Sequence, residues 1–497
     1  MSNILLFEQP ELAPRLPTVE GNVDYLTLRQ QLERMDELLA QTGAEGDFVA
    51  ASLQHWQGRA QQPLPKVTVR QRQKFQEHSR RALRCNLART LFGESFRDFS
   101  ARLADSPLLQ WFCGLGRLDV IRVPAKSTLQ RYATWLPEEQ VRSLVGRVLQ
   151  AGRAQAAKLD LAAPLDLDHY FLDTTCLKAN IHFPVDWVLL GDATRTLMRA
   201  VKLIRDHGLK HRMEPPAEFV RRMNHLSMAM THARRQAGGR QTRKKLLRAM
   251  KRQVKVVAAH ARRHRQLLAE HQAETDLTPK QAAQVLGRID GVLALLPAAR
   301  QQAHERIIGE RPVANADKLL SLYETDTHVI VRGKAGAEVE FGNTLLLGEN
   351  AQGLIADWKL FRESAPADAR LLQESVRRVE AALGVKPGGV VADRGFDSAA
   401  NAAWLEAEDI HNGVCPRSAR QLARRRRSRK FCRLARRRSQ TEGRIGILKN
   451  QFLGRPLRAK GFAHRELALS WAVLTHDLWV LARLPRRSEE AALAEAA

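Results

Sequence analysis

Three acidic residues stand at positions where carboxylates can do chemistry. Asp173 follows an aromatic, alternating stretch in FLDTT, and Asp393 follows the short apolar stretch GGVVA. Glu442 lies in RRRSQTEGRIGILKN, a segment of helical spacing that is otherwise basic. Strand ends converge at one edge of an α/β sheet, so an acid directly after an apolar strand is typical of an active site. We therefore expect these three acids to share one site.

The chemistry that suits such a set is metal-assisted cleavage of a phosphodiester. Mg²⁺ takes oxygen ligands, and two such ions about 3.5–4 Å apart activate a water and stabilise the leaving oxygen. Each acid alone has a simpler explanation, because an aspartate after a strand is commonly a turn residue and Glu442 could form solvated ion pairs with nearby arginines. The set favours a metal site because it lies within dense positive charge, and no phosphate loop or GxGxxG motif competes with it.

The positive charge is concentrated in two segments. The 497 residues contain 80 Lys and Arg against 53 Asp and Glu, a net charge of +27. Residues 221–265 carry fifteen bases and no acid, and residues 417–444 carry thirteen bases and the single acid Glu442. Concentrated charge of this kind indicates a polyanion, most often nucleic acid. Contacts to DNA phosphates are expected from Arg243, Lys244, Lys245, Arg248, Lys251, Arg252, Arg424, Arg425, Arg426 and Arg427.

Each basic segment also has a plainer interpretation. The first could be the solvated face of a coiled coil, although fifteen bases without an acid would repel one another along a helix. The second resembles a localisation-type basic tail. Its place between the last expected strand and the helix of Glu442 favours a clamp on substrate DNA.

The elements that would position these residues follow from hydrophobic periodicity. A helix is expected at 23–42, followed by a linker, and a compact helical region at 68–152. Within it, VPAKSTLQRYA predicts a turn and a helix capped by Ser127, which is either a DNA-reading helix with Lys126 and Arg131 or part of a packed bundle. The remaining expectations are a strand at DHYFLDTTC, helices over 195–308, strands at THVIVRG and AEVEFGNTLLLGEN, and GLIADWKLF next. After these come a helix at 366–383, a strand at GGVVADRGF, a helix at 398–407, a strand at IHNGVCP, and helices at 439–452 and 464–484.

The stretch 195–308 predicts an antiparallel helical hairpin. Its basic arm carries a 3–4 seam at Leu247, Met250, Val254, Val257, Ala261 and Leu268, and the returning arm repeats that spacing from Ile289 to Ala303. Thr278 and Pro279 suit the start of the second arm, and Pro297 should kink it. The hairpin is then an insertion after the first strand of an α/β core.

Several protein classes are excluded by what the sequence lacks. The N-terminus has an acid inside its apolar run and no charged leader, which argues against a secretory signal. No uninterrupted apolar stretch approaches 18 residues, so no membrane span is expected. Five cysteines without a CxxC pair suit a reducing cytosol and argue against a zinc finger.

Other candidate residues are weaker. Asp186 and Asp192 stand in expected loop or helix-start sequence, Asp357 is better explained as structural, and Asp397 as part of a helix cap. His260 and His264 are four residues apart within the basic segment and are expected to face phosphate or solvent. Trp187 is expected in a core, with stacking on a base as the alternative.

Four segments together resemble the bacterial insertion-sequence transposases of the DDE class: FLDTT, SLYETDTHVIVRGKAGAEVEFGNTLLL, ADRGF and RRRSQTEGRIGILKN. The last resembles the Y(2)R(3)E(6)K signature of those enzymes, since Arg438 stands four residues before Glu442 and Lys449 seven after it. The tyrosine of the signature falls at Ala435 and is absent. NIHFP further resembles the ISNCY group.

This resemblance implies an RNase H-like α/β core with a mixed five-stranded sheet, a helical N-terminal domain and a long helical-hairpin insertion. It implies that Asp173, Asp393 and Glu442 bind two Mg²⁺ ions, with Mn²⁺ as a substitute. Arg438 and Lys449 would flank that site, and Arg394 and Arg444 would add DNA contacts. Arg438, Glu442 and Lys449 share a helix face if the helix includes residue 438.

The resemblance also implies an activity and partners. The expected function is a cytoplasmic DNA transposase, nucleoid-associated when DNA-bound, which cleaves the terminal inverted repeats of its element and joins them to target DNA as a homodimer on paired ends. Expected divisions are 1–67, a DNA-binding domain at 68–155, the catalytic core at 156–194 and 309–455, the insertion at 195–308, and a tail at 456–497. The alternatives are a catalytically silent, transposase-derived DNA-binding protein and a nuclease of the same fold.

Overall fold

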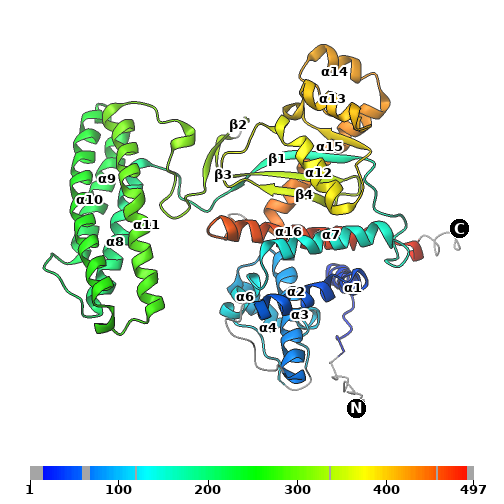
Figure 1. Cartoon of the computed structure of the whole chain (residues 1–497), viewed down its shortest axis with the longest axis horizontal. Coiled ribbons are helices and arrows are strands. Elements are labelled where there is room, and N and C mark those ends of the chain that lie inside the picture. The colour runs from blue at the N-terminus through cyan, green and yellow to red at the C-terminus, as the bar shows by residue number, and fades with distance from the viewer. Residues whose placement is uncertain (1–14, 59–67, 118–119, 335–336, 455–456, 490–497) are drawn as a thin grey trace. The chain divides into compact units, whose positions relative to one another are not determined.

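A computed structural model describes residues 15–58, 68–117, 120–334, 337–454 and 457–489. The chain divides into two compact units (Figure 1). The first comprises Met1–Leu177, Thr344–Phe361 and Ala365–Ala497, and the second comprises Lys178–Asn343 and Arg362–Ser364. The three acids belong to the first unit, and the basic segment 221–265 belongs to the second.

A mixed sheet forms the centre of the α/β part. In the described residues it has six strands, which are β1 (Tyr170–Lys178), β2 (His328–Lys334), β3 (Ala337–Asn350), β4 (Ile355–Leu360), β5 (Gly389–Ala392) and β6 (His411–Asn412). The strand order is β2-β3-β1-β5-β6, with β4 paired to β3. β3 pairs antiparallel with β2 and β4, whereas β1, β5 and β6 are parallel neighbours.

The expected number of five strands was wrong by one. β3 is 14 residues long, and its first half pairs with β2 while its second half pairs with β4. The stretch GLIADWKLF therefore forms a strand of its own, with Ile355, Trp358 and Leu360 buried. Along the second half of β3 the order is β4-β3-β1-β5-β6.

Helices cover this sheet and build the N-terminal part of the first unit. They are α1 (Val23–Thr42), α2 (Ala44–Gly58), α3 (Val69–Leu91), α4 (Phe96–Asp105), α5 (Pro107–Phe112), α6 (Lys126–Ala133), α7 (Glu138–Ala154), α12 (Leu372–Leu383), α13 (Ala399–Ala407), α14 (Ala419–Arg425), α15 (Arg429–Ile447) and α16 (Phe462–Leu481). α1 has the predicted bounds, whereas α2 lies where a linker was expected. α6 begins at Lys126 without a side-chain cap, so Ser127 lies inside the helix and does not cap it.

The sequence predicts an amphipathic last helix at 464–484, whereas α16 is buried along most of its length. It packs against α3, α7 and β4, and α7 and α16 run between the N-terminal helices and the sheet (Figure 1). Its Asp477 accepts a hydrogen bond from the Ile355 amide at 2.9 Å and contacts His476 Nδ1 at 2.9 Å. These polar bonds fix α16 to the start of β4.

A buried polar chain connects β1, β4 and α12. The Tyr170 hydroxyl lies 2.8 Å from Ser375 Oγ, which donates to Asp357 at 2.7 Å. Arg378 binds the same carboxylate through Nε at 2.9 Å and Nη2 at 2.7 Å. The structural interpretation of Asp357 is confirmed by these contacts. Gly348 of β3 leaves the room that Tyr170 needs, because a Cβ there would lie 1.8 Å from the Tyr170 hydroxyl oxygen.

The second unit contains a bundle of four helices, α8 (Asp186–Asp206), α9 (Pro216–Arg235), α10 (Gly239–Glu270) and α11 (Pro279–Ala303), with a π-helical turn at His304–Gly309. α10 and α11 are the arms of the predicted hairpin, and α8 and α9 pack beside them. The predicted seam is buried from Leu247 to Leu268, and so are its partners from Ile289 to Ala303. Thr278 caps α11 as expected, and Pro297 lies inside this helix without ending it.

One segment of this bundle, Pro279–Gly309, is long and apolar enough to cross a membrane by length and composition alone. Its Ile289, Val292 and Leu296 are buried in the bundle core. Core helices of bundles pass the same compositional test, so this segment is weak support for a membrane span.

Candidate active site

Asp173 and Asp393 lie at the point where two parallel strands stop pairing. β1 and β5 pair through Tyr170 with Val390, Phe171 with Val391 and Leu172 with Ala392, so the two aspartates follow as the next residues in register. Asp393 is the first residue after β5, and its carboxylate accepts a hydrogen bond from the Gly395 amide at 2.8 Å. β1 continues to Lys178, so Asp173 lies inside its strand and not at the strand end that the sequence suggested.

The carboxylate of Asp173 is largely buried, with 14% of its side chain exposed. It accepts a hydrogen bond from the Thr174 amide at 2.7 Å. Burial raises the pKa of Asp173 to about 6, and the negative charges of Asp393 and Glu442 add to that rise, while the Thr174 bond and Arg438 oppose it. The three acids are therefore close enough to influence one another electrostatically.

Glu442 reaches this region from α15. Arg438, one turn earlier on the same helix, places Nη1 3.5 Å from Glu442 Oε1 and 3.9 Å from Asp173 Oδ2. Its guanidinium thus lies between the strand acid and the helix acid and partly neutralises both. α15 begins at Arg429, ten residues before the expected start, so it includes residue 438. Among the described residues, no three His, Cys, Asp or Glu side chains form a ready metal cluster.

Lys449 also points to β1. It lies in a π-helical turn at Leu448–Phe452 that extends α15, and its ammonium donates to Thr175 Oγ1 at 3.1 Å. Thr175 is two residues beyond Asp173 on the same strand. Arg438 and Lys449 therefore both contact the strand of Asp173, one on each side of Glu442 in the sequence.

A buried carboxylate that the sequence analysis missed holds α15 against the sheet. Glu349 at the end of β3 is fully buried, and its Oε1 accepts from Arg437 at 2.9 Å, Thr441 at 2.7 Å and Arg444 at 3.1 Å. These three residues are spaced by four and three and form one face of α15. Arg437 also stacks over Phe171, with its guanidinium carbon 4.6 Å from the ring centre. The available signal was an acid closing the apolar stretch TLLLG, the same pattern that indicated Asp393.

A basic cavity of about 880 Å³ opens beside Asp393. Its walls come from the end of β5, the segment 413–417, α14 and α15, and they include Ala435, the position of the missing signature tyrosine. Five arginines line it, and these are Arg394, Arg417, Arg426, Arg436 and Arg438. A nucleic-acid phosphate backbone next to Asp393 would contact guanidinium groups on several sides.

The expected DNA contacts in this segment divide into two groups. Arg444 binds Glu349, and Arg425 donates to the carbonyl oxygens of Asn412 at 3.1 Å and Val414 at 2.8 Å, so both are used in holding the fold. Arg394, Arg424, Arg426 and Arg427 are exposed. Asp397 directly precedes Ser398, the N-cap of α13, and so lies in the N-cap region as expected, and its carboxylate accepts from the Arg417 amide at 2.8 Å.

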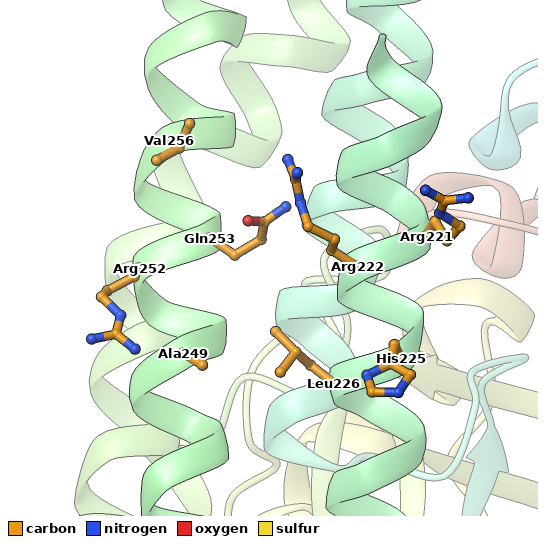
Figure 2. Close-up of a pocket in the computed structure, with 8 residues that line it drawn as sticks. All are labelled: Arg221, Arg222, His225, Leu226, Ala249, Arg252, Gln253 and Val256. Atoms are coloured by element: carbon orange, nitrogen blue, oxygen red, sulfur yellow. The ribbon is translucent and has the colours of Figure 1, made fainter. Parts of the chain in front are cut away.

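A second basic surface lies on the bundle, between α9 and α10. A groove of about 600 Å³ is lined by Arg221, Arg222, His225, Leu226, Ala249, Arg252, Gln253 and Val256. Figure 2 shows Gln253 of α10 and Leu226 of α9 lying between the two helices, with Arg252 on the outer side of α10. Lys245, Arg248 and Arg252 are exposed and spaced by three and four, hence they share one face of α10.

The other expected contacts on α10 are partly covered. Lys244 pairs with Glu310 at 2.7 Å, Lys251 lies 3.2 Å from His304 Nδ1, and Arg243 is half-buried. His264 does not face phosphate or solvent, because it continues the buried seam of α10 and its Nδ1 lies 2.8 Å from the His260 carbonyl oxygen.

The remaining candidates in this unit have structural contacts. Asp186 is buried and contacts Arg306 and Gln302, each at 2.9 Å. Asp192 pairs with Arg195 at 2.6 Å. Trp187 is buried in the bundle core, as expected, and because it is buried its ring has no exposed face on which a base could stack.

Comparisons with known proteins support one assignment. Residues 350–478 match the family model described as Transposase DDE domain. No curated protein and no solved structure matches the chain. The matched region contains Asp393, Glu442, Arg438 and Lys449 and begins one residue after Glu349, whereas Asp173 lies outside it. Membership of the ISNCY group stays a prediction. The match of residues 350–478 supports a DDE-type transposase.

Proposed function

We propose that this chain is a DNA transposase that cleaves the terminal inverted repeats of its mobile element and joins the freed ends to target DNA, with Asp173, Asp393 and Glu442 as the catalytic acids. The observation that carries the proposal is the β1–β5 register, which sets Asp173 beside Asp393 while Arg438 spans from Asp173 to Glu442. The strand order β4-β3-β1-β5-β6 supports an RNase H-like core.

The three acids fit divalent metal ions by the chemistry of their donors. All are carboxylates, the oxygen ligands that Mg²⁺ and Mn²⁺ prefer. The raised pKa of Asp173, caused by burial and by like charges, marks a site where a cation would favour the ionised form. When bound, two Mg²⁺ ions would activate the attacking oxygen and stabilise the leaving one. Glu349 would keep Glu442 in place by fixing the opposite face of α15.

The chain's own bases would orient the DNA. Arg438 lies between two carboxylates and can exchange them for a phosphate, to which a guanidinium binds through two parallel hydrogen bonds. Arg394, Arg426 and Arg436 would hold the strand that enters the cavity beside Asp393. The exposed row of Lys245, Arg248 and Arg252 would bind DNA outside the catalytic core. Assembly as a homodimer on paired ends belongs to the same proposal.

The test is cleavage of the element's own ends by the full chain with Mg²⁺ or Mn²⁺, with nicks mapped on each strand and joined products scored separately. Asp173→Asn, Asp393→Asn and Glu442→Gln should each abolish cleavage and leave DNA binding intact. Glu374→Gln is the matched control, because Glu374 forms surface ion pairs with Lys359 and Arg378. Full cleavage by any of the three acid variants would refute the site.

Two other outcomes identify the alternatives. Salt-sensitive DNA binding without cleavage by the unaltered chain would indicate a catalytically silent DNA-binding protein. Cleavage without joined products would indicate a nuclease.

Replacement of Lys245, Arg248 and Arg252 by Gln should reduce the salt dependence of DNA binding, because each lost phosphate contact lowers the slope of log affinity against log salt concentration by about one.

A further inference from the structure

A second cavity in the first unit is lined by none of the three acids. Its volume is about 590 Å³, within the usual range of about 300–1,000 Å³ for small-molecule sites. One wall is the end of α3 and the turn that follows it, another is the polar face of α6, and the third consists of Phe452, Leu453 and residues from Leu457 to Trp471. Gly93 in that turn has φ +62°, and a Cβ there would lie 2.4 Å from the Gln451 carbonyl oxygen, so the walls approach closely at this point.

The wall from α3 presents a buried cation. Arg89 stacks on Phe96 at 4.6 Å and donates through Nη1 to the Glu94 carbonyl oxygen at 3.2 Å, but its Nε is buried without a hydrogen-bond partner in the described part of the chain. Burial lowers the pKa of Arg89 to about 10, and the nearby charge of Arg458 lowers it further. Arg89 and Arg458 both line this cavity and are close enough to affect each other electrostatically, so an anion bound between them would relieve the repulsion of two like charges.

Two other polar atoms in the wall of the cavity also lack a hydrogen-bond partner among the described residues. Thr90 Oγ1 and Glu94 Oε2 are buried without hydrogen bonds among the described residues, although Glu94 pairs with Arg102 through its other oxygen at 2.7 Å. These atoms have almost no accessible surface, so they mark a polar wall behind the cavity and do not themselves contact a ligand in it. At the rim, Arg131, Arg458 and Lys460 are exposed and add positive charge.

The rest of the lining is apolar. Phe452, Leu453, Leu457, Leu467 and Trp471 form a continuous hydrophobic wall, and Phe96 lies on the side of Arg89. A cavity with cationic donors on one side and aromatic and aliphatic groups on the other suits a ligand that joins an anion to a flat ring. An inorganic anion alone would leave the apolar wall without contacts.

We propose that this cavity binds a nucleotide, with its phosphate between Arg89 and Arg458 and its base and sugar against the apolar wall. The nucleotide is either a free mononucleotide or the terminal nucleotide of a DNA strand that carries a 5′-phosphate. Arg131 and Lys460 at the rim add positive charge near the phosphate. The site is independent of the DDE acids and of their metal ions.

The test is isothermal titration calorimetry of the full chain in EDTA, which removes the cleavage reaction from the measurement. The probes are deoxyadenosine 5′-monophosphate, deoxyadenosine, inorganic phosphate, and one oligonucleotide with and without a 5′-phosphate. Arg458→Gln is the test variant because Arg458 is exposed, and circular dichroism of the variant checks that it is folded. Arg97→Gln on α4 is the control, because Arg97 is exposed, carries the same charge and lies outside the cavity.

For a free nucleotide, the monophosphate should bind at least about tenfold more tightly than deoxyadenosine or phosphate, and Arg458→Gln, but not Arg97→Gln, should weaken it by about tenfold. If the ligand is a DNA terminus, the monophosphate should bind poorly, and the oligonucleotide should bind more tightly with a 5′-phosphate than without one. That difference in affinity should vanish in Arg458→Gln and remain in Arg97→Gln. The proposal is overturned if neither ligand shows a phosphate-dependent affinity that Arg458→Gln reduces. Either result stands whether or not the chain cleaves DNA.

Discussion

Replacing Glu349 by Gln should detach the helix that carries Glu442 from the sheet. The Glu349 side chain is fully buried and one of its oxygens receives hydrogen bonds from Arg437, Thr441 and Arg444. Gln keeps the shape and one acceptor oxygen but removes the negative charge. Two guanidinium groups would then face a neutral amide in a largely buried place.

The expected loss follows from the contacts. Hydrogen bonds to charged groups contribute about 1.5–3 kcal/mol each, and removing one partner of a buried ion pair costs about 3–5 kcal/mol. Part of this is recovered, because Arg437 also donates to the Asn350 and Ala351 carbonyl oxygens and the Arg444 side chain is 25% exposed. We expect Glu349→Gln to lower the free energy of unfolding by about 2–4 kcal/mol. Thr441→Val, which removes one donor, should cost about 1–2 kcal/mol.

The assay is urea unfolding of the full chain, followed by circular dichroism, together with end cleavage at a temperature where every variant is folded. Glu374→Gln is the control for charge removal, and because that residue is exposed its effect should be within about 0.5 kcal/mol. A double-mutant cycle with Arg437→Met should give a coupling free energy of about 1 kcal/mol or more. Cleavage should fall in Glu349→Gln even when folded, because Glu442 is no longer positioned. A change in stability within about 0.5 kcal/mol, or additive single effects, would refute the anchoring role.

Two further predictions concern other parts of the first unit. Gly348→Ala places a Cβ 1.8 Å from the Tyr170 hydroxyl oxygen and should lower the free energy of unfolding in urea by about 1–3 kcal/mol or more. The control is Gly146→Ala, on a helix with open space around it, which should leave the stability unchanged or raise it. Equal effects of the two substitutions would contradict the close contact. Hydrogen bonds from Ser488 and Arg486 lower the pKa of Asp160 from 3.8 to about 2. Because the folded pKa is the lower one, this residue stabilises the fold above about pH 4 and loses that effect as the pH falls to about 2. The difference in melting temperature between the unaltered chain and Asp160→Asn should therefore narrow over that interval, and a constant difference would contradict the pKa shift.

Local pattern singled out Asp173 and Asp393 because each follows a short apolar run, although only Asp393 lies at a strand end, since β1 continues past Asp173 to Lys178. It was not sufficient for Glu349, which closes an equally apolar run. Whether a strand-end acid meets solvent, metal or a helix depends on partners far away in the sequence, and for Glu349 these lie 88 to 95 residues later. The spacing of Arg437, Thr441 and Arg444 was visible, but a charged helix face gives no sign that it will be covered.

The same limit applies to charged or polar residues inside apolar seams. His264 was expected to face phosphate or solvent because it lies in the basic segment, yet it follows Val257 and Ala261 on the seam that packs the bundle and is buried with them. α16 likewise contains His476 and Asp477, and these two side chains contact each other in the core. Polar residues that satisfy one another are tolerated in a core, and a sequence does not reveal such pairs before the fold brings them together.

The distribution of arginines around α15 shows how one basic segment serves both the fold and a polyanion. Arg437, Arg444 and Arg425 bind buried oxygens of the sheet and its loops, and their charge is used within the protein. Arg438 lies between two candidate catalytic acids, and Arg394, Arg426 and Arg436 line the cavity beside Asp393. The inward arginines therefore fix the helix on which Glu442 stands, while the outward ones provide charge where a DNA strand would have to lie. Net charge alone overstates the phosphate-binding surface, because on α15 Arg437 and Arg444, which hold the helix to the sheet, stand beside Arg436 and Arg438, which line the cavity.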